Sequence, residues 1–79
     1  MSIKDRGINS GNYAIKMAIL TRAGQYNTAW YNYEKYNNKP FRWIIDDMKA
    51  RFMKNALAEV TEVLEFYDKY GNKIDEHRF

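Results

Sequence analysis

The sequence predicts an all-α protein made of a helical hairpin and a long third helix, with an α+β fold ending in a C-terminal β-hairpin as the alternative. Helix-forming residues fill the first third of the chain, and aromatic residues recur at helical spacing in its middle. Apolar residues then recur every three or four positions almost to the end. With 79 residues, the chain is expected to form a single small domain (1–79), in which 1–9 and 74–79 are mobile.

The first helix is expected over 12–23. Its residues are mostly good helix formers, and they are preceded by the candidate N-caps Asn9, Ser10 and Asn12. Gly24 is a typical helix stop. A strand is the alternative, because Tyr13, Ile15, Met17 and Ile19 alternate with their neighbours, but propensity favours the helix.

The second helix is expected over 28–36, with Asn27 as its cap. A packed stripe would contain Tyr26, Ala29, Trp30 and Tyr33, and Tyr31 and Asn32 would face outward. Residues 24–33 also resemble the middle of a tetratricopeptide repeat, in which a glycine ends one helix and aromatic and alanine residues pack the next. No second repeat follows, so the resemblance implies a helical hairpin only.

The third helix is expected from Phe41 to Tyr70, with Pro40 in a position suited to its first turn. At 1.5 Å per residue it would be about 45 Å long, too long for two short helices to cover. It would therefore break near Asn55 or pair with another copy of the chain. In the alternative, the helix ends near Ala58, and a strand at 62–67 turns through 70–73 into a returning strand.

Composition limits the chemistry that the chain can perform. There is no cysteine, and the single histidine, His77, lies in a polar tail, so we expect no metal site and no cofactor. Asp46 and Asp47 are adjacent, which points them about 100° apart on a helix, and Asp47 can pair with Arg51 instead. Without a nucleophile–base pair or a glycine-rich phosphate loop, the chain is not expected to be an enzyme.

Charge and hydropathy indicate where the protein acts. No apolar run approaches the roughly 18 residues of a membrane-spanning helix, and the first residues do not form a signal peptide. The expected location is the cytoplasm, or the host cytoplasm if a virus or phage encodes the chain. Residues 1–57 carry ten basic and four acidic side chains (+6), whereas 58–79 carry three and six (−3), which gives the net +3.

The stretch from Gln25 to Trp43 contains seven of the thirteen aromatic residues, with asparagines and cations between them. Aromatic faces flanked by lysine and arginine suit stacking on unpaired bases, with the cations on phosphates. The predicted nucleic-acid contacts are Tyr31, Lys35, Tyr36, Lys39, Arg42, Trp43, Lys49, Arg51 and Lys54. Four acids at spacings of three predict a separate partner-binding face: Glu59, Glu62, Glu65 and Asp68.

The leading hypothesis is a small non-enzymatic protein that docks its basic and aromatic surface on RNA, on other single-stranded nucleic acid or on a nucleoprotein. Such a protein would suit a virus- or phage-encoded inhibitor of a host factor. The alternative is a protein–protein adaptor or inhibitor that binds no nucleic acid, acting through its long helix and acidic C-terminal face. That helix could also serve as a homodimer seam; no membrane partner is expected.

Overall fold

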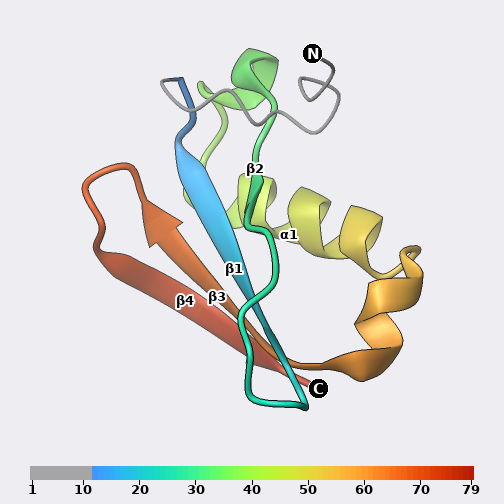
Figure 1. Cartoon of the computed structure of the whole chain (residues 1–79). Coiled ribbons are helices and arrows are strands. Elements are labelled where there is room, and N and C mark those ends of the chain that lie inside the picture. The colour runs from blue at the N-terminus through green and yellow to red at the C-terminus, as the bar shows by residue number, and fades with distance from the viewer. Residues whose placement is uncertain (1–11) are drawn as a thin grey trace, which may run out of the picture.

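The computed structural model describes residues 12–79, which form a four-stranded antiparallel sheet with one α-helix packed on one face (Figure 1). The strands, in sheet order, are β2 (Trp30–Tyr31), β1 (Ile15–Thr21), β3 (Thr61–Asp68) and β4 (Lys73–Arg78). Helix α1 (Phe41–Phe52) joins the two halves of the sheet, between the short 3-10 helices η2 (Glu34–Tyr36) and η3 (Ala56–Val60). The prediction of an all-α, helical protein is therefore wrong, and the α+β alternative is closer.

The helix predicted over 12–23 is wrong, because this segment forms strand β1. Ile15, Met17 and Ile19 are fully buried and alternate with partly exposed residues, which is the period of a strand with one face in the core. β1 pairs with β3 along its whole length. Helix propensity is worth only tenths of a kcal/mol per residue, so this packing overrides it.

The second predicted helix, over 28–36, is also wrong. Trp30 and Tyr31 form strand β2 opposite Met17 and Lys16, and only Glu34–Tyr36 turn into a 3-10 helix. Trp30 points to the core side, where its ring lies 5.4 Å from that of Phe52. The helical hairpin implied by the tetratricopeptide resemblance is therefore also wrong. Gly24, with a φ of 82°, lies in the turn after strand β1 and does not end a helix.

Helix α1 begins directly after Pro40, which confirms the predicted start, but it ends at Phe52. The prediction of one helix to Tyr70 is therefore wrong. The long helix was expected to break near Asn55 or to pair with another copy, but no α-helix resumes after this point within the described residues: the Asn55 side chain accepts a hydrogen bond from the Leu57 N–H and begins the 3-10 helix η3. Beyond η3, Val63 and Leu64 lie on opposite faces of the sheet, and both are buried in β3. Apolar residues on both faces produced the spacing in the sequence that resembled a helix.

The alternative for the C-terminal segment is close to the structure: β3 and β4 form a hairpin with Gly71 in its turn. Gly71 has a φ of 89°, a left-handed conformation that suits glycine. β4 occupies most of the tail, 74–79, that was expected to be mobile. The predicted mobile leader, 1–9, lies outside the described residues.

The core lies between α1 and one face of the sheet. It consists of side chains that are at most 2% exposed: Ile15, Met17, Ile19, Ile44, Ile45, Met48, Phe52, Leu64 and Phe66.

No described helix covers the other face of the sheet, which we call the open face (Figure 1). Cross-strand pairing places on it, from β2 to β4, Tyr31, Lys16, Ala18, Leu20, Val63, Glu65, Tyr67, Lys73, Glu76 and Arg78. Among residues 12–79, no helix is long and apolar enough to cross a membrane.

Candidate nucleic-acid interface

Three aromatic rings follow one another where η2 meets the beginning of α1, and we call them the aromatic ladder. The centroids of the Tyr33 and Tyr36 rings are 6.1 Å apart, and those of Tyr36 and Trp43 are 4.8 Å apart. All three rings meet at steep angles, and Trp43 remains 39% exposed. The structure thus brings together two predicted aromatic contacts, Tyr36 and Trp43, and adds Tyr33, which the sequence had placed in a packed stripe.

A cation lies over each ring of the ladder. The Lys35 ammonium is 5.2 Å from the centroid of Tyr36, and the Lys39 ammonium is 5.0 Å from that of Trp43. The Arg51 guanidinium is 4.4 Å from the Tyr33 ring, and it also pairs with Asp47 at 3.1 Å, as predicted. Neither lysine forms an ion pair with an acid in 12–79, so both can meet an anionic ligand.

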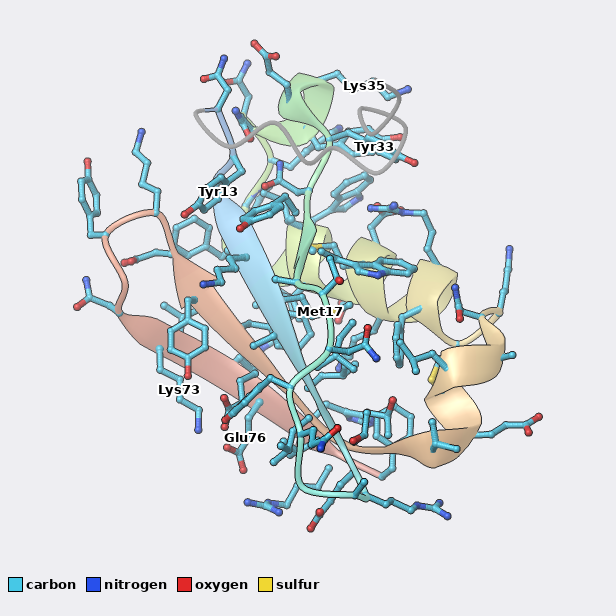
Figure 2. The ribbon with its side chains drawn as sticks, in the orientation of Figure 1. Tyr13, Met17, Tyr33, Lys35, Lys73 and Glu76 are labelled. Carbon is cyan, nitrogen blue, oxygen red and sulfur yellow. The ribbon has the colours of Figure 1, made fainter. Side chains whose placement is uncertain are left out.

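Asn32 holds the ladder against the sheet. It is 1% exposed, and its side-chain oxygen accepts hydrogen bonds from the Ala14 and Ile15 N–H groups, both at 2.8 Å. Its amide nitrogen donates to the carbonyl of Tyr33 at 2.8 Å and to Asn37 Oδ1 at 2.7 Å. The prediction that Asn32 faces outward is therefore wrong: this residue fixes the path of the chain into η2. Figure 2 shows Tyr33 and Lys35 at one end of the molecule, opposite Glu76.

Arg42 and Lys49 lie on the other flank of α1 and do not join the ladder. Arg42 pairs with Asp75 of β4 at 3.1 Å and with Asp46 at 3.6 Å. The pKa of Asp75 is held below its usual value by a hydrogen bond from the backbone N–H of Glu76, then by Arg42 and Lys49. The positive charge of Arg42 is thus directed at the protein's own carboxylates. Lys54 is exposed beyond the end of α1.

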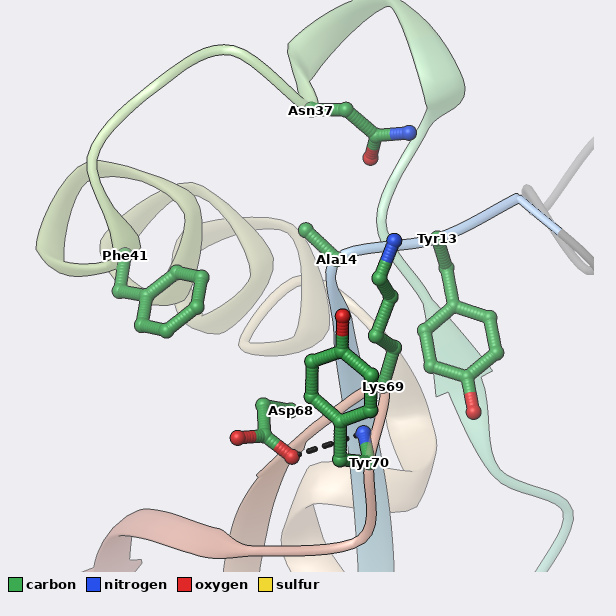
Figure 3. A pocket seen from close by; sticks show the side chains of 7 residues that line it. All are labelled: Tyr13, Ala14, Asn37, Phe41, Asp68, Lys69 and Tyr70. Atoms are coloured by element: carbon green, nitrogen blue, oxygen red, sulfur yellow. Dashed lines mark hydrogen bonds between the residues drawn. The ribbon is translucent and has the colours of Figure 1, made fainter.

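Tyr31 points to the open face, where its ring lies 4.6 Å from that of Tyr13. Next to Tyr13 is a pocket of about 250 Å³ at the end of the sheet (Figure 3). Its walls come from the start of β1, the η2–α1 connection and the β3–β4 turn: Tyr13, Ala14, Asn37, Phe41, Asp68, Lys69 and Tyr70. The sequence missed the aromatic walls because Phe41 and Tyr70 fitted the seam of a long helix.

The four acids predicted to form one face do not gather. Glu59 lies in η3, whereas Glu62, Glu65 and Asp68 lie in β3, where a spacing of three alternates between faces. Glu65 Oε1 accepts hydrogen bonds from the hydroxyls of Tyr26 (3.1 Å) and Tyr67 (3.0 Å), which raise the pKa of both tyrosines. Glu65 is therefore already occupied within the open face.

On the open face, Lys73 pairs with Glu65 at 3.8 Å and with Glu76 at 2.5 Å, and Arg78 pairs with Glu76 at 3.1 Å. Asp46 and Asp47 pair separately, with Arg42 and Arg51. The His77 ring packs edge-on against Phe79, with centroids 5.0 Å apart. Residues 12–79 contain no group of three His, Asp or Glu side chains that could hold a metal ion.

Comparison of the chain with models of protein families, with curated proteins and with solved structures gave no match. The site must therefore be interpreted from its own geometry.

Proposed function

We propose that this protein binds single-stranded nucleic acid, in the first place RNA, through the aromatic ladder and its two lysines, and that it does so without catalysing a reaction. The observation that carries the proposal is the pairing of an exposed ring, Trp43, and a partly exposed ring, Tyr36, with uncompensated cations. Trp43 and Tyr36 offer ring surface for stacking, and Lys39 and Lys35 stand about 5 Å from those rings without an acidic partner. Stacked bases and neighbouring phosphates need this combination.

A single strand suits this surface better than a duplex does. Bases in a duplex already stack on each other, so an aromatic ring reaches their faces only when they are unpaired. Reading of a major groove needs a helix with free side chains for the base edges. In α1, Arg42 and Arg51 are engaged by Asp75 and Asp47, which leaves the ladder as the better supported surface.

No observation favours the alternative of a protein adaptor, since the long helix is absent and the acids are dispersed. The proposal includes a cytoplasmic location, which the absence of cysteine from the sequence favours.

The proposal is tested by fluorescence anisotropy, with labelled single-stranded RNA and a duplex DNA of equal length, at low and at physiological salt. We expect the RNA to bind more tightly than the duplex. Trp43→Ala should weaken RNA binding by about tenfold, because stacking contributes roughly 1–3 kcal/mol per base. Lys39→Gln should weaken it less and mainly at low salt.

Lys54→Gln is the matched control, because Lys54 is also exposed but lies outside the ladder. Absence of RNA binding at low salt would overturn the proposal for this protein. If Trp43→Ala bound like the unchanged protein while Arg42→Ala and Lys49→Ala lost affinity, the opposite flank of α1 would be the binding face and the ladder assignment would be wrong.

A further inference from the structure

We infer that the pocket in Figure 3 holds one unpaired nucleobase of the strand that crosses the aromatic ladder. The inference rests on the proposed function and adds a second site, with its own residues and its own kind of contact.

The walls of the pocket suit a flat aromatic ligand. Tyr13, Phe41 and Tyr70 supply rings from three separate segments, and Phe41 and Tyr70 are 47% and 79% exposed. Its volume of about 250 Å³ falls just below the roughly 300–1,000 Å³ of pockets for drug-sized ligands, so it suits a smaller planar group such as a single base. Large exposed rings gathered around one hollow are typical of a ligand site.

The positive charges around the pocket suit the phosphate groups of a nucleic-acid backbone. Lys69 lines the pocket, with its ammonium 5.8 Å from the Tyr70 ring, and Lys16 lines an adjoining hollow that shares Tyr13 and Tyr70. Neither lysine forms an ion pair with an acid in the described residues. Both therefore lie close enough to the pocket to contact the phosphate of a bound nucleotide.

The one acid in the wall, Asp68, is already engaged. Its Oδ1 accepts hydrogen bonds from the N–H groups of Tyr70 and Asn72, both at 2.9 Å, and Oδ2 accepts one from Asn72 Nδ2 at 3.1 Å. Figure 3 shows the bond from Tyr70 to Asp68 beside the ring. The carboxylate therefore shapes the turn that presents Lys69 and Tyr70.

The pocket and the ladder draw residues from the same short stretch of the sequence. Phe41 and Asn37 line the pocket, while Tyr36 and Trp43, one and two residues away, belong to the ladder. The side-chain oxygen and nitrogen of Asn37 are bonded to Asn32 and to the Asn12 carbonyl. Since that amide is engaged, base selection in the pocket should depend on stacking and should tolerate different bases.

The first test is a titration of the ¹⁵N-labelled full chain, followed by NMR, with adenosine 5′-monophosphate and, separately, with ribose 5-phosphate. The two probes share a phosphate and differ in the base. We expect the nucleotide to shift the amide signals of Tyr13, Lys69 and Tyr70 and the sugar phosphate to leave them nearly unchanged. Equal shifts with both probes would identify an anion site only and overturn the inference.

The second test measures RNA affinity after Tyr70→Ala, with Tyr26→Ala as the matched control. Both tyrosines are largely exposed, but Tyr26 lies at the far end of β1, opposite Leu20. We expect a loss of about tenfold for Tyr70→Ala and less than about twofold for Tyr26→Ala. The NMR titration remains decisive if a variant folds poorly.

The outcomes separate the two proposals. If Trp43→Ala weakens RNA binding but Tyr70→Ala does not, the pocket assignment fails while the ladder stands. If the unchanged protein binds no RNA, both fail. If tryptophan amide shifts the pocket signals at lower concentration than the nucleotide does, the occupant is a protein side chain, and the nucleobase inference is overturned.

Discussion

At the scale of single residues, the structure depends strongly on Asn32, whose side chain makes four hydrogen bonds while almost fully buried. Two of them satisfy the backbone N–H groups of Ala14 and Ile15 at the start of β1. The other two fix the entry into η2 and orient Asn37. One amide thus joins the sheet to the ladder, and its loss would affect both stability and binding.

We predict that Asn32→Ala lowers the free energy of unfolding by roughly 2–4 kcal/mol, since the buried N–H of Ile15 and the partly buried N–H of Ala14 would lose their acceptor. Urea denaturation followed by circular dichroism measures this. Asn38→Ala is the control, because Asn38 lies exposed in the same loop, and it should change stability by less than about 0.5 kcal/mol. Similar values for the two variants would contradict the role assigned to Asn32.

Asp68 gives a prediction for pH. A backbone hydrogen bond from Asn72, with further bonds from Asn72 and Tyr70, lowers the pKa of Asp68 from the ordinary 3.8. A lowered pKa in the folded state contributes stability above the unfolded value, which is lost as the pH falls through the folded value. Asp68→Asn should therefore be less stable than the unchanged protein near pH 7, with the difference shrinking below about pH 3. Chemical denaturation across that range measures the difference, and a constant gap would contradict the prediction.

At the scale of elements, the β3–β4 turn both closes the sheet and presents Lys69 and Tyr70. Gly71 takes a φ of 89° there, and a Cβ at this position would meet no atom within 4 Å. We predict that Gly71→Ala costs about 1–2 kcal/mol through backbone strain alone. Gly71→Asn should cost less, because asparagine tolerates left-handed conformations. Thermal unfolding of the two variants checks this, and equal losses would show that the strain is not the cause.

The errors in predicting the strands have one physical origin. The sequence of β1 carries signals for a strand and for a helix. Ile15, Met17 and Ile19 alternate as in a strand, whereas Ala14, Ala18 and Leu20 are good helix formers. The preference for a helix sums small local contributions, whereas the strand is selected by pairing with β3, whose paired residues lie 40 to 53 positions further along the chain. A single sequence does not reveal that partner.

The start of helix α1 was predictable because its signal is local. Pro40 precedes the first turn, and Asn55 begins the next short helix by accepting a bond from Leu57. The spacing of Ile44, Ile45 and Met48 is that of one buried helical face. The same spacing seemed to continue through Val63 and Leu64 because β3 buries residues on both of its faces.

At the scale of the whole molecule, part of the candidate site was predictable from residue types. Tyr36, Trp43, Lys35 and Lys39 lie close together in sequence, and they remain together in space. Which cations stay uncompensated could not be predicted, because Arg42 finds its partner Asp75 in β4. The pocket could not be predicted from the sequence either, because its walls come from three segments that are brought together only in the folded protein.

The distribution of uncompensated lysines gives a prediction for salt. Lys16, Lys35, Lys39 and Lys69 line the ladder, the pocket and its adjoining hollow, and none pairs with an acid in 12–79. Each phosphate neutralised on a single strand changes the slope of log K against log salt by about 0.7. If all four lysines contact phosphates, the slope should be about −3.

Anisotropy titrations at several salt concentrations separate charge from stacking. Each Lys→Gln change at these four positions should reduce the magnitude of the slope by about 0.7, whereas Lys54→Gln should leave it unchanged. Trp43→Ala should lower affinity by a similar factor at every salt concentration, because stacking releases no counterions. If Lys35→Gln and Lys39→Gln also lowered affinity equally at all salt concentrations, these lysines would not contact phosphates. They would instead act by supporting the rings beneath them.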